Sequence, residues 1–314
     1  MVEPPASRIL VIKLGALGDF AQAIGPFAAI RRHHANAADA HITLLTTAPC
    51  APFAEAGGWF DEVWIDARPP ALRVGAWMTL RRRLRGARFQ RVYDLQTSDR
   101  SAFYFRLFWP GPTPEWSGIA RGCSHPHANP RRDFMHTQER QEEQLRMAGI
   151  AQVPGPDLSW VEADIGRFQL AARYGLLVAG GAPHRPAKRW PADRYAALAG
   201  MLGAEGIEPV LLGAAGDRGV AAEIGARCPA ARDLTGLTGL LDIATLARGA
   251  ACAVGNDTGP MHLIAMAGCP SVVLYSHDSD PALCAQRGPD VTILQRRRLD
   301  ELAPDEVKAA LEPR

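Results

Sequence analysis

Residues 251–275 read ACAVGNDTGPMHLIAMAGCPSVVLY, and this stretch decides the fold. Its two apolar runs, 251–254 and 271–275, are short and rich in valine, which predicts buried strands. The residues between them, 259–267, predict a helix that begins just after Asp257 and Thr258. Two short strands joined by a helix form a βαβ unit, whose strands lie parallel in one sheet. We therefore expect an α/β fold.

The same alternation of strands and helices extends from this unit in both directions. Residues 153–156, VPGP, are typical of a break, so we place the domain boundary there and expect a first domain at 1–155 and a second at 156–314. In the second domain we expect strands at 175–179 and 209–212, and helices at 191–202, 217–227, 242–248 and 299–311. In the first we expect strands at 8–14, 41–46, 62–65 and 91–96, an Arg-rich helical segment before the last of these, and helices at 20–32, with a kink at Pro26, and at 135–147. Residues 108–130 are crowded with Pro, Gly and Trp and predict a loop.

The composition excludes several classes of protein. The chain has 314 residues, of which 47% are hydrophobic, and a formal net charge of +2, which argues against long-range disorder and against a dedicated nucleic-acid binder. No uninterrupted apolar run reaches ~18 residues, and the apolar stretch 9–12 ends at Lys13, too early for a secretion signal. The six cysteines form no CxxC pair, so we expect neither a disulfide framework nor structural zinc. A cytoplasmic protein of two domains fits these observations.

Lysine is rare in this chain. Of the 35 basic residues, thirty-two are arginine, and Lys13, Lys188 and Lys308 are the only lysines. Lys13 and Lys188 fall in turns that follow predicted strands, one in each domain. A lysine is a compact point charge, whereas arginine is a planar fork, so a retained lysine favours a site beside a phosphate.

Three turns between a predicted strand and a predicted helix carry polar residues. In open α/β sheets such turns bind ligands, because helix N-termini attract anions. The first turn, KLGALGD at 13–19, has the spacing GxxGD, which differs from the dinucleotide fingerprint GxGxxG. Asp19 is either the N-cap of a helix or a general base over a ligand site.

The other two turns lie in the second domain. Residues 180–191, GGAPHRPAKRWP, offer Lys188 to an anion, although a solvated basic loop is the alternative. In the third turn, Asp257 and Thr258 are both good N-cap residues, and Gly259 would let a ligand approach the backbone. His262 follows Thr258 by four residues and therefore shares its side of a helix. Helix capping alone does not account for Gly259 and His262, and the combination is typical of a nucleotide-sugar pocket.

Together these segments resemble glycosyltransferase family 9, the ADP-heptose:lipopolysaccharide heptosyltransferases. The similar stretches are ILVIKLGALGD at 9–19, YDLQTSDRS at 93–101, KRWP at 188–191, VGNDTGPMHLIAMAGCPSVVLY at 254–275 and the terminal LAPDEVKAAL at 302–311. The resemblance implies a GT-B fold, in which two Rossmann-like domains with mostly parallel sheets face each other across a cleft, with the last helix able to pack back on the first domain.

The resemblance also implies the roles of individual residues. Asp19 would be the base that deprotonates the acceptor hydroxyl, and Gln96 and Arg100 would line the acceptor side. On the donor side, Lys188 would contact the phosphates, Asp257 the sugar, and Thr258, Gly259 and His262 the diphosphate. The family implies an ADP-heptose donor, a lipid-linked saccharide acceptor and no metal or other cofactor. Asp278-Ser-Asp280 has the spacing of a metal-binding DxD pair, but we interpret it as a surface loop.

Two questions stay open at this stage. Six arginines crowd residues 81–91; they form either a solvated helix face or a patch that meets anionic lipid or phosphorylated saccharide, which would place the protein peripherally on the inner face of the cytoplasmic membrane. Nucleic acid is not expected there, because no recognition motif accompanies the run. The alternatives to heptose transfer are a GT-B enzyme that uses another nucleotide sugar, and a non-catalytic nucleotide-sugar binding protein.

Overall fold

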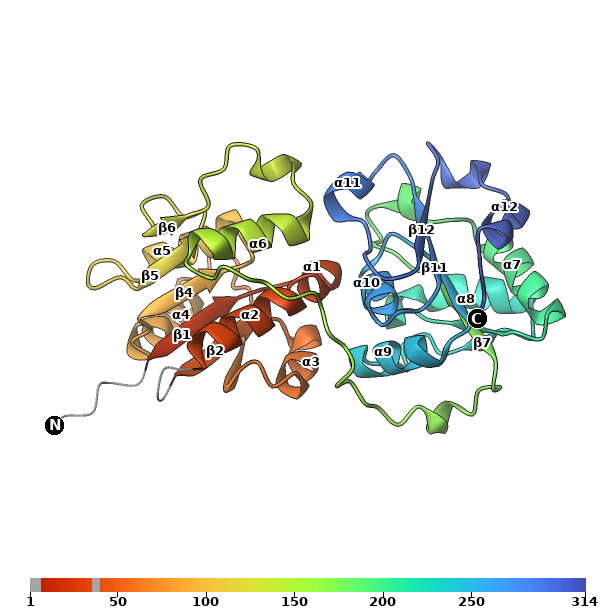
Figure 1. Ribbon diagram of the computed structural model, residues 1–314, viewed down its shortest axis with the longest axis horizontal. Helices are drawn as coiled ribbons and strands as arrows, with labels where there is room; N and C mark the ends of the chain where they lie inside the picture. The colour runs from red at the N-terminus through yellow and green to blue at the C-terminus, as the bar shows by residue number, and fades with distance from the viewer. Residues whose placement is uncertain (1–6, 36–39) are drawn as a thin grey trace. The chain divides into compact units, whose positions relative to one another are not determined.

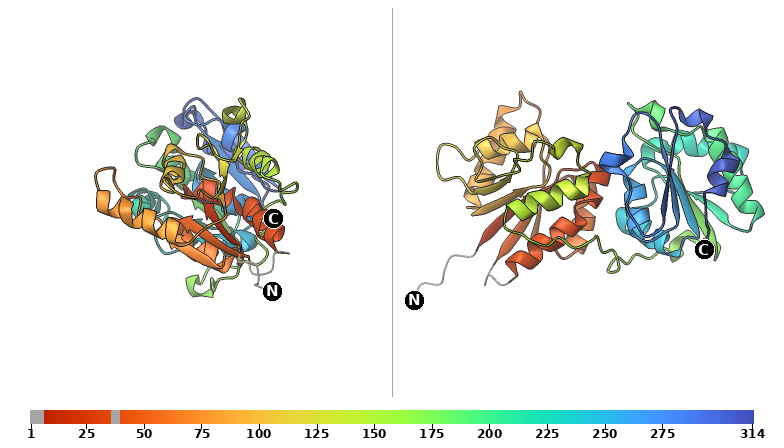
Figure 2. Two further views of the ribbon diagram at one scale, coloured as in Figure 1. Left: turned by 90° about the vertical axis from the view of Figure 1, so that its left-hand side faces the viewer. Right: turned by 45° about the horizontal axis from the view of Figure 1, so that its top comes forward.

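The computed structural model describes residues 7–35 and 40–314, and the chain divides into two compact units, Met1–Pro156 and Asp157–Arg314. Each unit contains one six-stranded sheet with helices on both faces (Figures 1 and 2). Within the described residues, no helix combines the length and the apolarity that crossing a membrane requires. None of the six cysteines forms a disulfide, and five of them are buried.

The sheet of unit 1 is parallel and has the strand order β3-β2-β1-β4-β5-β6. This is the Rossmann order, in which the chain starts at the centre, builds outward on one side and then crosses to the other. The strands are β1 (Arg8–Ile12), β2 (His41–Thr46), β3 (Glu62–Ile65), β4 (Arg91–Asp94), β5 (Glu115–Gly118) and β6 (His125–Pro126). The helices are α1 (Leu17–Ala21), α2 (Ile24–His34), α3 (Ala51–Ala56), α4 (Val74–Gly86), α5 (Asp99–Arg106) and α6 (Thr137–Met147).

Successive side chains of β1 point to opposite faces of the sheet, and helices cover both faces. Every residue from Ile9 to Ile12 is buried, as expected for a central parallel strand. Leu10 and Ile12 pack with Leu84 of α4 and Tyr104 of α5. On the opposite face lie α2 and α6, which contact each other (Figure 1).

The sheet of unit 2 repeats this plan with the order β12-β11-β10-β7-β8-β9, again parallel throughout. The strands are β7 (Tyr174–Val178), β8 (Glu208–Leu211), β9 (Arg232–Asp233), β10 (Cys252–Asn256), β11 (Ser271–Tyr275) and β12 (Val291–Gln295). The helices are α7 (Ala192–Ala204), α8 (Arg218–Arg227), α9 (Leu240–Gly249), α10 (Gly259–Met266), α11 (Pro281–Cys284) and α12 (Pro304–Ala309).

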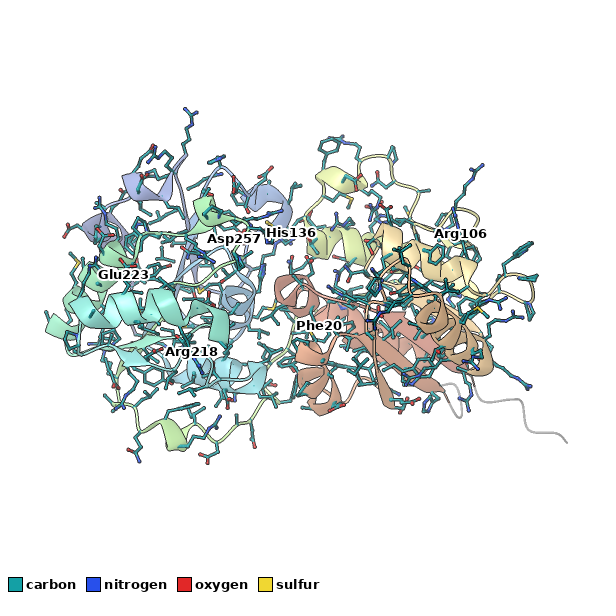
Figure 3. The ribbon with its side chains drawn as sticks, turned by 180° about the vertical axis from the view of Figure 1, so that it is seen from behind. Phe20, Arg106, His136, Arg218, Glu223 and Asp257 are labelled. Atoms are coloured by element: carbon teal, nitrogen blue, oxygen red, sulfur yellow. The ribbon has the colours of Figure 1, made fainter. Side chains whose placement is uncertain are left out.

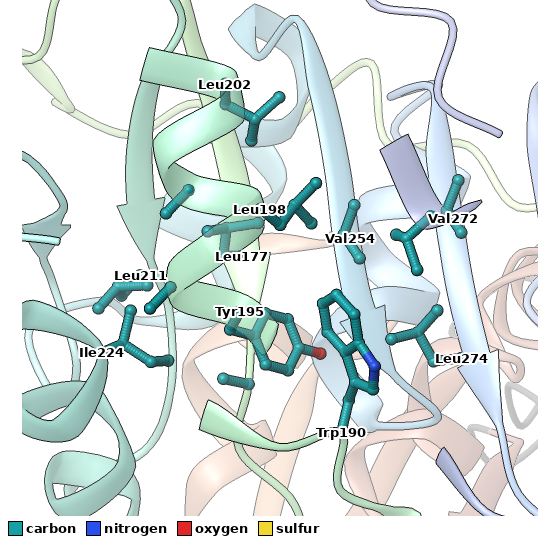
Figure 4. Packing of buried hydrophobic residues seen from close by; sticks show 14 of the residues in the cluster. Leu177, Trp190, Tyr195, Leu198, Leu202, Leu211, Ile224, Val254, Val272 and Leu274 are labelled. Carbon is teal, nitrogen blue, oxygen red and sulfur yellow. The ribbon is translucent and has the colours of Figure 1, made fainter. Parts of the chain in front are cut away.

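One face of this second sheet carries a large apolar core. Leu177, Val254 and Leu274 of the strands pack beneath Trp190 and Tyr195, whose rings meet edge to face at 4.8 Å (Figure 4). The same core contains Leu198 and Leu202 of α7, Ile224 of α8, and Val307 and Leu311 near the C-terminus. The buried side chains of α12 therefore belong to the core of unit 2.

Three predicted elements differ from the structure. The helix predicted at 20–32 is two helices: the break falls at 22–23, and Pro26 lies in the first turn of α2, where its missing N–H costs no hydrogen bond. The terminal helix is also divided, because Pro304 holds Ala303 extended (ψ 146°) and restarts the helix. The loop predicted at 108–130 contains β5 and β6; Trp116, fully buried, anchors β5 beside β4.

Candidate functional site

The predicted donor-side residues lie at the carboxyl ends of the two central strands of unit 2. β7 leads into the turn 179–181, and β10 leads through Asp257 and Thr258 into α10. These strands are neighbours, and the strand order reverses between them. Open α/β sheets bind ligands beyond this point, where the two following turns diverge. The fold therefore places the second and third sequence motifs side by side.

Asn256 joins these two turns. Its buried side-chain oxygen accepts hydrogen bonds from the backbone N–H of Trp190 (3.0 Å) and from the hydroxyl of Tyr195 (3.1 Å). Its amide nitrogen donates to the carbonyls of Ala179 (2.9 Å) and Gly180 (3.0 Å). All the hydrogen-bonding groups of the side chain are thus directed at the backbone or the core. Asn256 is a structural residue of the site that the sequence analysis did not single out.

Asp257 is the charged centre of the site, and Figure 3 marks its position. The ammonium of Lys188 lies 2.7 Å from Oδ2, and the Ser279 hydroxyl donates to the same oxygen at 2.7 Å. The amide nitrogen of Gln286 donates to Oδ1 at 3.1 Å. Burial alone would raise the pKa of Asp257, but these hydrogen bonds, with that of Lys188 the strongest, hold it below its usual value. Asp257 is therefore a carboxylate with a paired cation.

His262 belongs to the same network through Gln286. The Gln286 amide nitrogen lies 3.2 Å from Nε2 of His262, and the Gln286 oxygen accepts a hydrogen bond from the Tyr275 hydroxyl at 2.8 Å. His262 and Gln286 are both buried. Because Tyr275 fixes the orientation of the amide, Gln286 presents its nitrogen to both Asp257 and His262. The histidine is thereby held one turn into α10.

Thr258 occupies the N-cap position of α10 without capping it. Its backbone is extended (φ −142°, ψ 163°), as an N-cap requires, but its side chain makes no capping hydrogen bond. Its hydroxyl oxygen is buried without a hydrogen-bond partner among the described residues. The first turn of α10 also presents backbone N–H groups that the helix itself leaves unpaired. Helix capping therefore does not explain this threonine, whereas an anionic ligand would.

Two residues of this site came from segments that the sequence analysis did not assign to it. Ser279 lies in the loop interpreted as a surface loop; Asp278 and Asp280 are indeed exposed, but the serine between them turns toward Asp257. Gln286 follows α11 in a stretch without any motif. No spacing rule connects either residue to β10, so only the folded chain reveals them.

Asp217, at the start of α8, lies between the turns that follow β7 and β8. Its carboxylate accepts hydrogen bonds from the backbone N–H groups of Ala214 (2.9 Å) and Gly181 (3.3 Å). A Cβ at Gly180 would lie 2.4 Å from this carboxylate, so the close approach requires a glycine there. The carboxylate therefore ties the turn after β8 to the turn after β7.

In unit 1, Asp19 lies beyond the carboxyl end of β1. It is the third residue of α1, whose N-cap is Ala16, so the N-cap interpretation of Asp19 is wrong. Asp19 is half-buried. Nearby Lys13 is buried and donates a hydrogen bond to the carbonyl of Leu95 at 2.9 Å. Burial lowers the pKa of Lys13 to about 8, although the negative charge of Asp19 acts in the opposite direction.

Gln96 and Arg100 follow β4, the strand beside β1. The Gln96 side-chain oxygen accepts a hydrogen bond from the backbone N–H of Leu14 at 2.7 Å, which ties the two turns together. Arg100 is directed elsewhere: it donates to the carbonyl of Pro69 at 3.3 Å, and its guanidinium lies 5.6 Å from the ring centre of Trp77. The structure therefore joins Gln96 to the turn that carries Asp19, while Arg100 contacts the segment before α4.

No group of three or more His, Cys, Asp and Glu side chains within 7–35 and 40–314 is arranged to hold a metal ion. The charged groups at the two strand edges include the Lys188–Asp257 pair and Asp217 in unit 2, and Lys13 with Asp19 in unit 1.

Comparisons with known proteins show which family the chain is similar to. Residues 77–302 match the model of glycosyltransferase family 9 (heptosyltransferase). Lipooligosaccharide heptosyltransferase 2 of Haemophilus influenzae is 38% identical over 104 residues, which are 32% of this chain and 30% of that protein. The alignment thus spans less than a third of this relative.

Two solved structures from Escherichia coli share the fold across nearly the whole chain. ADP-heptose lipopolysaccharide heptosyltransferase II has a TM-score of 0.78 at 24% identity and covers 96% of this chain and 97% of its own. Heptosyltransferase WaaC, solved with ADP, has a TM-score of 0.75 at 20% identity, and the match covers 96% of this chain and 98% of the WaaC chain. The predicted GT-B class, with two Rossmann-like units, is confirmed. Because the family model matches most of its length, the chain belongs to glycosyltransferase family 9, the heptosyltransferase family.

Proposed function

We propose that this protein transfers a heptose from an ADP-activated donor to a lipid-linked saccharide of the lipopolysaccharide core. The observation that carries the proposal is the turn after β10, where the unpaired Thr258 hydroxyl, the N-terminus of α10 and the ammonium of Lys188 lie together. Such an arrangement suits a diphosphate. The family, the name of the curated relative and the ADP bound to WaaC support the identity of the nucleotide and the sugar.

On the donor side, each residue has a physical reason for its proposed role. The diphosphate leaves with growing negative charge, which Lys188, Thr258 and the N–H groups of α10 would stabilise. Gly259, the first residue of α10, lets the phosphates approach the backbone. Asp257, kept ionised by its partners, accepts hydrogen bonds from sugar hydroxyls. His262, held by Gln286, completes the contacts to the diphosphate.

On the acceptor side, Asp19 is the proposed general base, with Gln96 and Arg100 lining the acceptor. We propose that the reaction needs no metal, because the cation and helix N-terminus in unit 2 stabilise the leaving group. Transfer that persists in EDTA would support this, and transfer restored only by a divalent cation would contradict it.

A transfer assay with ADP-heptose and a lipid-linked core acceptor tests the proposal. We expect ADP release that depends on the acceptor, together with a product one heptose heavier. ADP-heptose binding without ADP release would indicate a non-catalytic binding protein. Binding of a UDP-sugar in preference to ADP-heptose, in a thermal-shift panel of nucleotide sugars, would indicate a different donor.

Replacing Thr258 with valine separates ligand binding from stability. The substitution keeps the shape and removes a hydroxyl that has no partner in the described structure, so the unfolding midpoint should not fall. If the hydroxyl binds the diphosphate, the affinity for ADP should fall about 10- to 150-fold, since a hydrogen bond to a charged group contributes ~1.5–3 kcal/mol. Calorimetry with ADP measures this. Unchanged affinity would remove Thr258 from the donor site.

Replacing Lys188 with arginine tests whether the site needs a point charge. The ammonium fits 2.7 Å from Asp257, in a position where the longer, planar guanidinium cannot keep the same geometry. We expect the affinity for ADP to fall about 10-fold. Lys308→Arg is the matched control, because Lys308 pairs with Glu205 at 2.8 Å in the same unit. If both variants bind ADP with the wild-type affinity, the phosphates do not require a lysine at position 188.

A further inference from the structure

Gln286 connects three polar side chains in the interior of unit 2. It follows α11 and is only 3% exposed. Its amide nitrogen lies 3.1 Å from Oδ1 of Asp257 and 3.2 Å from Nε2 of His262. Its amide oxygen lies 2.8 Å from the hydroxyl of Tyr275. A primary amide has one acceptor oxygen and one nitrogen with two protons, so its orientation decides which neighbours donate and which accept.

The carboxylate of Asp257 determines which end of the Gln286 amide faces it. Burial would raise the pKa of Asp257, but hydrogen bonds from Lys188 and Ser279 to Oδ2 hold it below its usual value. An ionised carboxylate only accepts hydrogen bonds. If the amide were reversed, its oxygen would lie 3.1 Å from Oδ1 without a proton between the two atoms. The nitrogen of Gln286 therefore faces Asp257.

Tyr275 favours the same orientation from the opposite end of the amide. Burial and the charge of Asp257 raise the pKa of Tyr275, so its hydroxyl keeps its proton and can donate it. The hydroxyl lies closer to the Gln286 oxygen than to the carbonyl of Cys284, which is 3.2 Å away. The oxygen of the amide thus has a donor, and its nitrogen directs both protons to the other two neighbours.

The orientation of Gln286 determines where His262 carries its proton. One N–H of the amide is directed to Asp257, and the second is directed to Nε2 of His262. A ring nitrogen that accepts a hydrogen bond must present its lone pair, so Nε2 is unprotonated and the proton of the neutral ring is on Nδ1. A proton on Nε2 would instead place two donors against each other at 3.2 Å.

We propose that Gln286 is a positioning residue that fixes His262 as the neutral tautomer with its proton on Nδ1. Because helical side chains lean toward the N-terminus of their helix, the imidazole lies over the turn that begins at Thr258. His262 then meets the diphosphate through Nδ1–H, as a neutral donor, and the positive charge comes from Lys188. Only this contact rests on the proposed function, since the tautomer follows from the neighbours of Gln286. A single amide thereby links Asp257, the proposed sugar ligand, to the imidazole beside the phosphates.

Nitrogen-15 NMR of histidine-labelled protein, without added ADP, measures the tautomer directly. The chain has nine histidines, and the signals of His262 are those that disappear in His262→Asn. In the wild type, Nδ1 should have the chemical shift of a protonated ring nitrogen, and Nε2 that of an unprotonated one. A wild-type ring that is protonated on Nε2, or on both nitrogens, would overturn the proposal.

Two substitutions of Gln286 show whether this residue sets the tautomer. Gln286→Glu offers Nε2 only a carboxylate oxygen, so Nε2 should become protonated. Gln286→Leu removes the donor, so the signature of a single Nδ1–H tautomer should be lost. Gln295→Glu is the matched control, because Gln295 is exposed in β12 of the same unit, and it should leave the His262 signals unchanged.

A glutamine that only supported the loop after α11 would affect stability and leave the protonated nitrogen where it is. Circular dichroism melting identifies the variants that fold. Wild-type His262 signals in both folded Gln286 variants would therefore show that Gln286 does not position the proton.

ADP calorimetry measures the consequence for the ligand. Gln286→Leu should lower the affinity for ADP about 10-fold, the effect of one hydrogen bond to a charged group, whereas Gln295→Glu should bind ADP with the wild-type affinity. If Gln286→Leu changes the His262 signals but not the affinity, His262 does not meet the diphosphate through Nδ1. Failure of the proposed function would appear separately, as absent heptose transfer by a wild type whose His262 signals show Nδ1–H.

Discussion

Replacing Asp19 with asparagine should lower the turnover number about 10²- to 10⁴-fold and leave the affinity for ADP unchanged. The carboxylate takes the proton from the acceptor hydroxyl as that oxygen attacks the sugar, and an amide cannot accept it. The substitution is nearly isosteric. The N-cap of α1 is Ala16, whose side chain makes no capping hydrogen bond, so the substitution leaves the N-cap of this helix unchanged. Initial rates of ADP release, with acceptor and donor both saturating, measure the effect.

Asp305→Asn is the matched control for this experiment. Asp305 is an exposed carboxylate in the first turn of another helix, α12. The Asp305→Asn variant should transfer heptose at the wild-type rate. If Asp19→Asn also keeps the wild-type rate, Asp19 is not the base. If it instead loses ADP affinity, the residue serves the donor rather than the acceptor.

Most of the central fold could be predicted because its signal is local. The strands β10 and β11 and the helix between them coincide with the apolar runs of 251–275 to within a residue or two. Buried parallel strands are continuous apolar stretches, so their positions are visible without knowledge of their neighbours. The edge strands β6, β9 and β12 lack this signal: the burial pattern of β12 is mixed, and β6 and β9 have two residues each.

The candidate site was predictable only where its residues follow a central strand. Asp257, Thr258 and His262 come directly after β10, so their proximity follows from the local sequence. Gln286 and Ser279 reach the same carboxylate from beyond β11, through loops whose path depends on tertiary packing. Asn256 was inside the quoted motif, yet its role as a structural clamp depends on Trp190 and Tyr195, more than sixty residues away.

Replacing Asn256 with aspartate should lower the free energy of unfolding by about 3–5 kcal/mol at neutral pH. The change replaces a buried NH₂ group by an oxygen that faces the carbonyls of Ala179 and Gly180, at positions where the native distances are 2.9 and 3.0 Å. Three oxygens would then face one another without a proton, and the new carboxylate would be buried without a cation. Urea unfolding of the variant and the wild type measures the loss.

The pH dependence of the free energy of unfolding distinguishes the effect of a buried carboxylate from a simple packing defect. Burial between two carbonyls should raise the pKa of the new carboxyl in the folded protein above its unfolded value. The folded state then binds the extra proton more tightly, so the stability deficit should be smallest below the unfolded pKa of ~3.9 and should grow as the pH rises through the folded pKa. A deficit that is the same at pH 4 and pH 7 would argue for altered packing. Thr258→Val, two residues away, is the matched control. Thr258 is proposed to bind the ligand, so we expect it to lose its hydroxyl without loss of stability. Asn256 holds the site together, so its amide cannot be exchanged without such a loss.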